Sequence, residues 1–214
     1  MNGYEHRKPL SHVVARYDRV ARFYSVFEPL FLIFPPARRR AVAALELAPG
    51  QSVIELCVGT GRNLDLLVAA VGLQGRVVGV DASRGMLAQA QRLVERRGWR
   101  NVTLLQQDVR ELDVEGDFDG VLFSLSYSVI PDPRPALARA WAVLVPGGRL
   151  AVMDLGFTQA RLARLLDPVA KLLQQLGPGD AYSEPWKDLA EYAPVEMERF
   201  LLRLYYVCRI RKPF

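Results

Sequence analysis

The stretch Val53–Asn63 constrains the fold of this chain more than any other part of the sequence. It contains an apolar strand that runs into two glycines, Gly59 and Gly61, and a helix begins directly after them. Glycines are needed where the backbone turns sharply or approaches a ligand closely. This pattern is typical of a dinucleotide loop, of a methyl-donor loop, or of a tight strand–helix turn without a ligand, and alone it does not separate the three.

Acidic residues near the ends of neighbouring strands narrow these alternatives. A dinucleotide site expects a third glycine at the position where this chain has Leu64. Instead, Glu55 lies inside the apolar strand, where a carboxylate is costly unless a partner compensates it. Asp81 ends the next apolar run, where an acid can accept hydrogen bonds from ribose hydroxyls, and Asp108 ends the third. Because parallel strands present their carboxyl ends at one edge, we expect the glycine loop and both aspartates to meet there.

Strand-like and helix-like segments alternate from residue 51 onward, which predicts a doubly wound α/β domain with a mainly parallel sheet. The expected strands are 52–58, 76–80, 102–106, 118–124 and 149–155, with the last strands within 195–211. The expected helices are 12–25, 38–48, 62–71, 83–97, 135–144 and 158–176. We therefore predict an N-terminal helical lid or interface segment, 1–48, followed by one domain, 49–214.

The composition argues against several classes of protein. Half of the 214 residues are apolar and 24% are charged, which is typical of a globular chain that buries a core. No window approaches the roughly 18 apolar residues that span a bilayer, and no signal-peptide pattern opens the chain, so we expect a cytoplasmic protein. Two cysteines, Cys57 and Cys208, are too few for a disulfide framework or a metal cluster, and no metal is expected.

The net charge of +5 is unevenly distributed along the chain. Residues 1–50 carry +4 and residues 199–214 carry +5, whereas residues 51–198 carry −4. Basic ends are typical of a protein that meets a polyanion or an anionic membrane surface, and equally of a solvated surface. The apolar run Leu30–Phe34 before Arg38–Arg40 favours a membrane interface, with packing on the core as the alternative.

A nucleic-acid partner is not expected. Tyr205 and Tyr206 lie beside Arg209, Arg211 and Lys212, a mixture that also occurs in RNA-binding surfaces. The same alternation of apolar and basic residues is more often a sheet strand with exposed basic positions. We therefore interpret this stretch as a strand.

Considered together, residues 50–156 resemble the class I S-adenosylmethionine-dependent methyltransferases. The resemblance rests on Glu-x-x-x-Gly-x-Gly, on the strand-end aspartates Asp81 and Asp108, on Phe118-Asp119 opening the fourth strand, and on Leu-x-Pro-Gly-Gly-x-Leu before the fifth. It implies an enzyme with a seven-stranded sheet, a reversed last strand and S-adenosylmethionine as cofactor. One departure is Cys57, which stands where the family usually has glycine.

The resemblance also implies a set of cofactor-binding residues. In the family the two glycines flank the methionine moiety, the second strand-end acid binds the ribose hydroxyls, and the third accepts from the adenine amino group. Ala82 and Met86 would border the adenine. The implied set is Glu55, Cys57, Gly59, Thr60, Gly61, Asn63, Asp81, Ala82, Met86, Asp108, Val109 and Ser124.

The acceptor is suggested by the segment Leu122–Asp132, which occupies the exit of the fourth strand. It lacks the Asn-Pro-Pro-Tyr motif of many nucleic-acid amino methylases, and with Tyr17-Asp18 and Tyr24 it resembles the bacterial lipid N-methyltransferases. These act on phosphatidylethanolamine or on the amine of a diacylglycerol-homoserine lipid. Tyr127 is expected to orient the amine or to hold the methylated cation against its ring, and Tyr17 and Tyr24 to close the pocket; core packing is the alternative.

These expectations combine into one functional hypothesis with two alternatives. We expect a methyltransferase that N-methylates a lipid amine headgroup, attached peripherally to the inner face of the membrane. The first alternative is a quinone or other small-molecule C- or O-methyltransferase. The second is a cofactor-binding interaction module without catalysis. The number of methyl groups transferred and the oligomeric state do not follow from the sequence.

Overall fold

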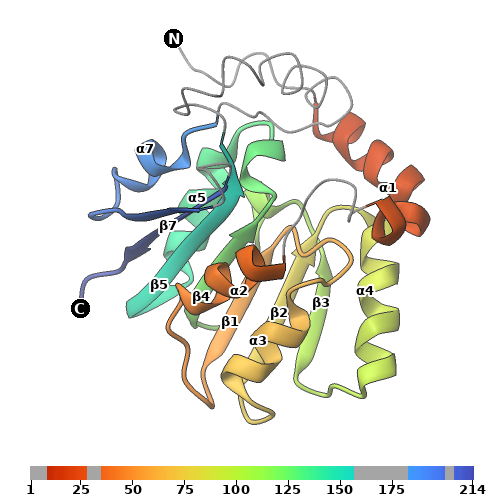
Figure 1. The fold of residues 1–214 in the computed structure, drawn as a ribbon, viewed down its shortest axis with the longest axis horizontal. Coiled ribbons are helices and arrows are strands. Elements are labelled where there is room, and N and C mark those ends of the chain that lie inside the picture. The colour runs from red at the N-terminus through yellow and green to blue at the C-terminus, as the bar shows by residue number, and fades with distance from the viewer. Residues whose placement is uncertain (1–8, 28–34, 157–182, 201–204) are drawn as a thin grey trace.

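The computed structural model describes residues 9–27, 35–156, 183–200 and 205–214; of residues 23–27 it describes the backbone alone. Two helices, α1 (Leu10–Phe27) and α2 (Pro35–Ala43), precede the sheet (Figure 1). The strands are β1 (Ser52–Leu56), β2 (Arg76–Asp81), β3 (Val102–Gln106), β4 (Phe118–Ser124), β5 (Leu144–Leu155), β6 (Glu196–Phe200) and β7 (Tyr205–Arg211). The remaining helices are α3 (Leu64–Val71), α4 (Arg84–Arg97), η2 (Val109–Glu111), η3 (Tyr127–Val129), α5 (Pro133–Ala142) and α7 (Pro185–Leu189).

The seven strands form one sheet in the order β3-β2-β1-β4-β5-β7-β6. The five strands from β3 to β5 are parallel, whereas β7 runs antiparallel to both β5 and β6. Strand order reverses beside β1, which pairs with β2 on one side and with β4 on the other. This confirms the predicted doubly wound sheet with a reversed last strand, and it places the switch point, where such sheets bind ligands, between β1 and β4.

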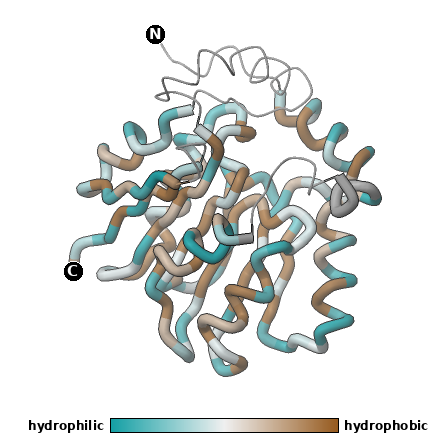
Figure 2. The backbone as a smooth tube through the Cα atoms, viewed as in Figure 1, coloured by the Kyte–Doolittle hydropathy of each residue, from teal (hydrophilic) through white to brown (hydrophobic). Residues whose placement is uncertain are grey.

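The strands alternate their side chains between two hydrophobic cores, one on each face of the sheet. Along β1, Val53 packs with α2 and α3, whereas Ile54 packs with α5. Figure 1 shows α2 and α3 in front of the sheet, and Figure 2 shows hydrophobic stretches concentrated on the strands between the helices. Burial on both faces explains why the strands are nearly continuous apolar runs.

Most predicted elements are confirmed within a few residues; α2 spans Pro35–Ala43 where 38–48 is predicted, and the start of strand β5 differs as much. This strand begins at Leu144 rather than at Arg149, because Phe118 pairs with Leu144 and Gly120 with Arg149 across a register shift. The Pro146-Gly147-Gly148 sequence is therefore an irregularity inside a strand and not a turn before it. The predicted helix 158–176 and the Leu30–Phe34 segment lie outside the described residues.

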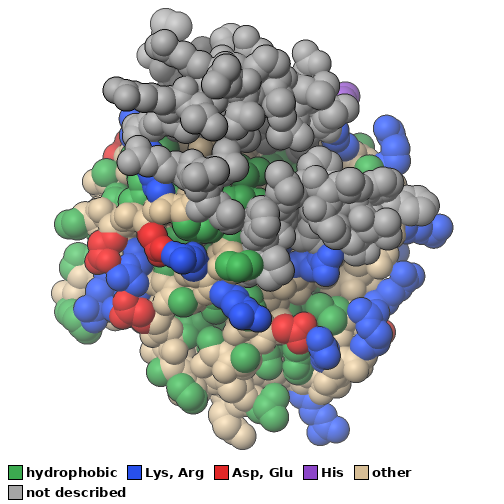
Figure 3. Space-filling model, in the orientation of Figure 1, with side chains coloured by type: hydrophobic (Ala, Val, Ile, Leu, Met, Phe, Trp, Pro, Cys, Tyr) green, Lys and Arg blue, Asp and Glu red, His purple; other side chains and the backbone are tan. Residues whose placement is uncertain are grey.

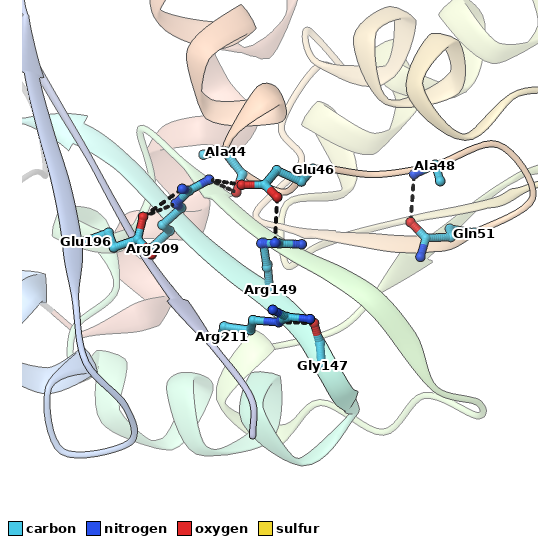
Figure 4. A network of polar contacts seen from close by, with 9 residues as sticks. All are labelled: Ala44, Glu46, Ala48, Gln51, Gly147, Arg149, Glu196, Arg209 and Arg211. Carbon is cyan, nitrogen blue, oxygen red and sulfur yellow. Dashed lines mark hydrogen bonds and ion pairs between the residues drawn. The ribbon is translucent and has the colours of Figure 1, made fainter. Parts of the chain in front are cut away.

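Basic residues of the C-terminal strands are neutralised by acidic neighbours. Arg209 donates to Glu46 at 2.6 Å and to Glu196 at 2.7 Å, and Glu46 also pairs with Arg149 at 2.5 Å (Figure 4). Arg40 pairs with Glu198 and lies over the Phe200 ring. Figure 3 accordingly shows red and blue side chains intermingled on this side of the molecule.

Some basic residues near the two ends are therefore already bound within the protein, and the expected polyanionic partner stays a prediction. Arg40 and Arg209 are held by carboxylates, and the Arg211 guanidinium donates to the Gly147 carbonyl at 3.1 Å. A cation that is already paired contributes little to the attraction of a second anion. In the described part of the chain, no helix has the length and hydrophobicity that a membrane crossing requires.

Candidate active site

A pocket of about 870 Å³, open solvent included, lies at the carboxyl ends of the central strands. Its walls come from the loops after β1, β2, β3 and β4, and from α1. Ten of the twelve predicted cofactor-binding residues line it, together with Tyr17. They are Glu55, Cys57, Gly59, Thr60, Asp81, Ala82, Met86, Asp108, Val109 and Ser124.

In the loop after β1, every second residue has a left-handed backbone conformation: φ is 61° at Cys57, 57° at Gly59 and 81° at Gly61. A Cβ added to Gly59 would have no atom within 4 Å, so this glycine leaves room above the loop for a ligand. A Cβ on Gly61 would lie 2.7 Å from a methyl of Leu64 and 3.3 Å from Ala90, so this glycine lets α3 and α4 pack closely. Gly61 therefore supports the pocket without lining it.

Cys57 is the unusual member of the loop. A non-glycine residue with positive φ is strained and persists where the surroundings hold it, often at a functional site. Burial, with a smaller contribution from nearby carboxylates, raises the pKa of its thiol well above the ordinary value. The thiol is therefore protonated at neutral pH and acts as a small apolar wall of the pocket.

Asp81 ends β2 with both carboxylate oxygens directed at backbone donors. Oδ2 accepts from the Gly59 amide at 2.8 Å and Oδ1 from the Ser83 amide at 2.8 Å. Burial raises the pKa of Asp81 above 3.8, against these two hydrogen bonds. Each oxygen keeps a further acceptor position, so the carboxylate is held rigidly in the pocket wall and can still accept from a pair of hydroxyls.

Glu55 is the least satisfied acid of the pocket. Its Oε1 accepts from Asn63 Nδ2 at 2.5 Å, and the Asn63 Oδ1 accepts from Arg38 at 3.2 Å. Its Oε2 is buried and has no hydrogen-bond partner. Burial raises the pKa of Glu55 from 4.5 to about 7, although the Asn63 hydrogen bond and the Arg38 charge oppose the shift. A buried carboxylate oxygen left open toward a pocket fits a cationic ligand group such as an ammonium.

Asp108 follows β3 and caps η2. Its carboxylate accepts from the Arg110 amide at 3.0 Å and from the Arg110 guanidinium at 2.7 to 3.1 Å. Burial alone favours the protonated acid, but these hydrogen bonds and the arginine charge hold the pKa of Asp108 below its ordinary value. Asp108 is thus a fixed anion at the third strand end.

The described pocket residues also include a buried serine without a partner. The Ser124 hydroxyl, at the end of β4, is buried without a hydrogen-bond partner, as is Glu55 Oε2. β4 lies beside β1 in the sheet, so two unsatisfied polar atoms face one pocket from neighbouring strands. Buried polar groups without partners are rare and indicate a ligand or water that completes them.

Tyr127 does not have the predicted place. Its side chain is fully buried, its ring meets Phe123 edge-on at 5.4 Å, and its hydroxyl donates to Asp188 at 2.8 Å. It does not line the pocket, so the expectation that it orients the acceptor is corrected in favour of core packing. The side chain of Tyr24 lies outside the described residues, so its predicted role stays untested.

Two residues belong to the site for reasons that the sequence did not show. Arg38 was grouped with Arg39 and Arg40 as a possible membrane contact, yet it lines the pocket and contacts Asn63. Asn63 was expected to touch the cofactor, but it lies behind Glu55 and supports it. The available signal was the buried position of Glu55, because an acid inside a strand requires such partners.

Comparisons with known proteins agree with this geometry. The family model "Methyltransferase domain" matches residues 53–148. A 2-phytyl-1,4-naphtoquinone methyltransferase of Thermosynechococcus vestitus is 31% identical over 153 residues, which are 70% of this chain and 67% of that protein. An aklanonic acid methyltransferase of Streptomyces sp. (strain C5) is 36% identical over 119 residues, covering 55% of this chain and 54% of that protein. The chain thus spans between half and two thirds of these two relatives.

Solved structures share the fold at low sequence identity. A Haloferax volcanii methyltransferase in complex with its Trm112 activator matches with a TM-score of 0.77 and 17% identity, covering 94% of this chain and 98% of that one. A structure described as a DhpI complex with SAH matches with a TM-score of 0.68 and 20% identity, over 94% and 95% of the two chains. The sheet order, the glycine loop and the first relative together place this chain among the class I S-adenosylmethionine-dependent methyltransferases, and it belongs to that family.

Proposed function

We propose that this protein transfers the methyl group of S-adenosylmethionine to a small, largely apolar acceptor, of the kind represented by a quinol or an aromatic polyketide. The proposal rests on one observation: the pocket has one acidic wall and one mainly aliphatic wall. The strand ends β1 to β3 supply Glu55, Asp81 and Asp108. The wall made by α1 and by the segment after β4 is mainly aliphatic, with Leu10, Val13, Val14, Leu125, Val129 and Ile130.

The acidic wall matches the charges and hydroxyls of the cofactor. In this proposal Asp81 accepts from the two ribose hydroxyls and Asp108 accepts from the adenine amino group, as in the family. Ala82 and Met86 border the adenine. We assign Glu55 Oε2 to the methionine ammonium, because this buried oxygen has no partner in the protein. Gly59 leaves the loop open beneath that moiety.

Bound S-adenosylmethionine supplies an activated methyl group on a sulfonium, so the protein needs no metal or covalent nucleophile for the transfer. The chain's own contribution is alignment of donor and acceptor, which reduces the entropic barrier by several kcal/mol. The aliphatic residues of α1 and of the segment after β4 exclude water from the acceptor. Ser124, at the end of β4, offers a hydroxyl to orient a polar group of the acceptor or the cofactor.

The relatives support the small-molecule alternative over the lipid amine. One relative is named for a naphthoquinone and another for aklanonic acid. The apolar wall fits such acceptors, and it also fits an acyl chain. A lipid amine is therefore kept as the competing outcome of the test.

The basic side chains near the pocket suggest how a membrane-dissolved acceptor is reached. Arg19 and Arg22 of α1 and Arg84 and Arg92 of α4 are exposed, and Figure 3 shows basic side chains along this side of the molecule. We propose that this side of the molecule, formed by α1 and α4, contacts an anionic membrane. The C-terminal strands, where Arg209 pairs with acids, do not. Vesicle co-sedimentation tests it: Arg19→Gln with Arg22→Gln should weaken binding to anionic vesicles, and equal binding of wild type to neutral and anionic vesicles would contradict it.

The acceptor class is tested with radiolabelled S-adenosylmethionine and two acceptors offered separately. One is a reduced, unmethylated naphthoquinone, and the other is phosphatidylethanolamine in vesicles. We expect label in the quinol after chromatography. Label confined to the phospholipid would favour the lipid reading, and label in neither, with intact cofactor binding, would contradict both.

A further inference from the structure

An acidic residue of helix α1, Asp18, hydrogen-bonds to the N-terminal end of α4. Oδ1 of Asp18 accepts from the Ser83 hydroxyl at 2.6 Å and from the Gly85 amide at 2.8 Å. Both donors belong to the first turn of α4, where a carboxylate is favoured by unpaired amides and by the helix dipole. Tyr17, the preceding residue, lines the pocket, so this contact determines where the pocket wall formed by α1 lies.

The same contact leads directly to Asp81. The Ser83 hydroxyl donates to Asp18 and accepts from the Met86 amide, while the Ser83 amide donates to Asp81 Oδ1 at 2.8 Å. Asp81 in turn accepts from the Gly59 amide at 2.8 Å. A continuous path of hydrogen bonds therefore joins α1 to the glycine loop through Ser83 and Asp81.

A second observation shows that α1 and α4 approach closely at this point. A Cβ on Gly85 would lie 3.1 Å from the Asp18 Cα, 3.1 Å from its Oδ1 and 3.1 Å from the Ala21 Cβ. Glycine inside a helix is unfavourable by about 1 kcal/mol relative to alanine. The space at Gly85 is nevertheless taken by α1, so Gly85 permits the docking of this helix.

We propose that Asp18 is a positioning residue that latches α1 across the pocket and thereby sets the affinity for the cofactor. With the latch formed, Tyr17 and the aliphatic side chains Val13 and Val14 face the pocket, and Ser83 is held against Asp81. With the latch broken, α1 loses these two hydrogen bonds to α4, and the cofactor loses one wall of its site. The inference concerns cofactor binding and is independent of the acceptor's identity.

Isothermal titration calorimetry with S-adenosylhomocysteine tests the latch. We expect Asp18→Ala and Gly85→Ala each to raise Kd about tenfold, which corresponds to the loss of about one charged hydrogen bond. The double variant should be no weaker than the worse single variant by more than about twofold, because both changes break the same contact. Asp18→Asn keeps a side-chain oxygen acceptor and should recover most of the affinity.

Two matched variants control for changes in the helices themselves. His12→Ala alters an exposed position of α1, and Arg96→Ala alters an exposed position of α4; both should bind like the wild type. Gly85→Ala is informative because alanine favours the helix while obstructing the docking of α1.

Limited trypsin digestion gives a second readout. Cleavage after Arg19 and Arg22 should be suppressed by S-adenosylhomocysteine in the wild type, and much less in Asp18→Ala. An unchanged Kd in Asp18→Ala, whether or not its melting temperature falls, would overturn the proposal, because a purely structural contact lowers stability without changing affinity.

Discussion

The carboxylates of the pocket and those beside the C-terminal strand β7 have different surroundings. Beside β7, Glu46 and Glu196 share Arg209, and Glu46 also holds Arg149 (Figure 4). In the pocket, Glu55 keeps one buried oxygen without a partner, and burial raises its pKa to about 7. Paired surface charges stabilise a fold modestly, whereas an incompletely satisfied buried acid destabilises it and is retained for another reason.

This difference indicates which part of the chain holds the ligand site. The excess of basic residues at the C-terminal end first suggested a partner surface, but the structure uses those arginines to join β5, β6 and β7 to the segment after α2. The acidic middle of the chain holds the pocket, where Glu55 Oε2 and the Ser124 hydroxyl are left without a partner. Unsatisfied groups, and not the surplus charge, therefore mark the ligand site.

The largest expected effect follows from removing Asp81. Asp81→Ala should raise Kd for S-adenosylhomocysteine about 100-fold or more, since two charged hydrogen bonds to ribose hydroxyls are lost at about 1.5 kcal/mol each. Calorimetry measures the change. Asp119→Ala is a matched control, because Asp119 accepts from Gln51 and from the Ser52 amide away from the pocket; it should lower the melting temperature and leave Kd unchanged. Equal Kd values for Asp81→Ala and the wild type would contradict the claim that Asp81 binds the cofactor.

The next effect concerns Glu55 and has opposite signs for binding and stability. Glu55→Gln should weaken S-adenosylhomocysteine about tenfold, because the methionine ammonium loses a charged partner. It should leave 5′-methylthioadenosine binding unchanged, because that compound lacks the ammonium. Equal losses for both compounds would contradict the assignment of Glu55.

The stability of Glu55→Gln sharpens the same comparison. The folded-state pKa of Glu55 lies near 7 and its ordinary value is 4.5, so the cost of its ionisation to folding builds up between about pH 4.5 and 7 and is fully present above pH 7. Glutamine should therefore stabilise the ligand-free protein by about 1 to 3 kcal/mol at pH 8. The gain should fall as the pH decreases from 7 toward 4.5, where the wild-type side chain is protonated. Thermal melts across this pH range provide the test, and a gain that is independent of pH would contradict it.

The smallest effect is expected for the ion pairs beside β7. Arg209→Gln removes both bridges to Glu46 and Glu196 and should lower the free energy of unfolding by about 1 kcal/mol or less, with a smaller loss at high salt. Its Kd for S-adenosylhomocysteine should stay within about twofold of wild type. A large loss of cofactor affinity would show that these ion pairs are coupled to the pocket.

Local patterns predicted the parts of the fold that depend on neighbouring residues. The strands over Val102–Gln106 and Phe118–Ser124 were predicted from apolar runs alone. Most of the residues that line the pocket could also be predicted, because glycine loops and strand-end acids converge at one edge of a parallel sheet.

Contacts between distant segments could not be predicted in this way. Asp18 and Ser83 are 65 residues apart, and nothing in either segment indicates that they meet. Tyr127 lies in a segment where serine and apolar residues alternate, which is typical of a strand, whereas the chain forms the short helix η3 there, so the pattern does not tell a buried side chain from one facing the pocket. The bulge that extends β5 back to Leu144 depends on its pairing with β4.

A crystal structure with S-adenosylhomocysteine tests the central claim most directly. We predict that both ribose hydroxyls lie about 3 Å from the Asp81 carboxylate and that the ammonium lies about 3 Å from Glu55 Oε2. The compound bound elsewhere, or bound here with Glu55 Oε2 still without a partner, would contradict the account.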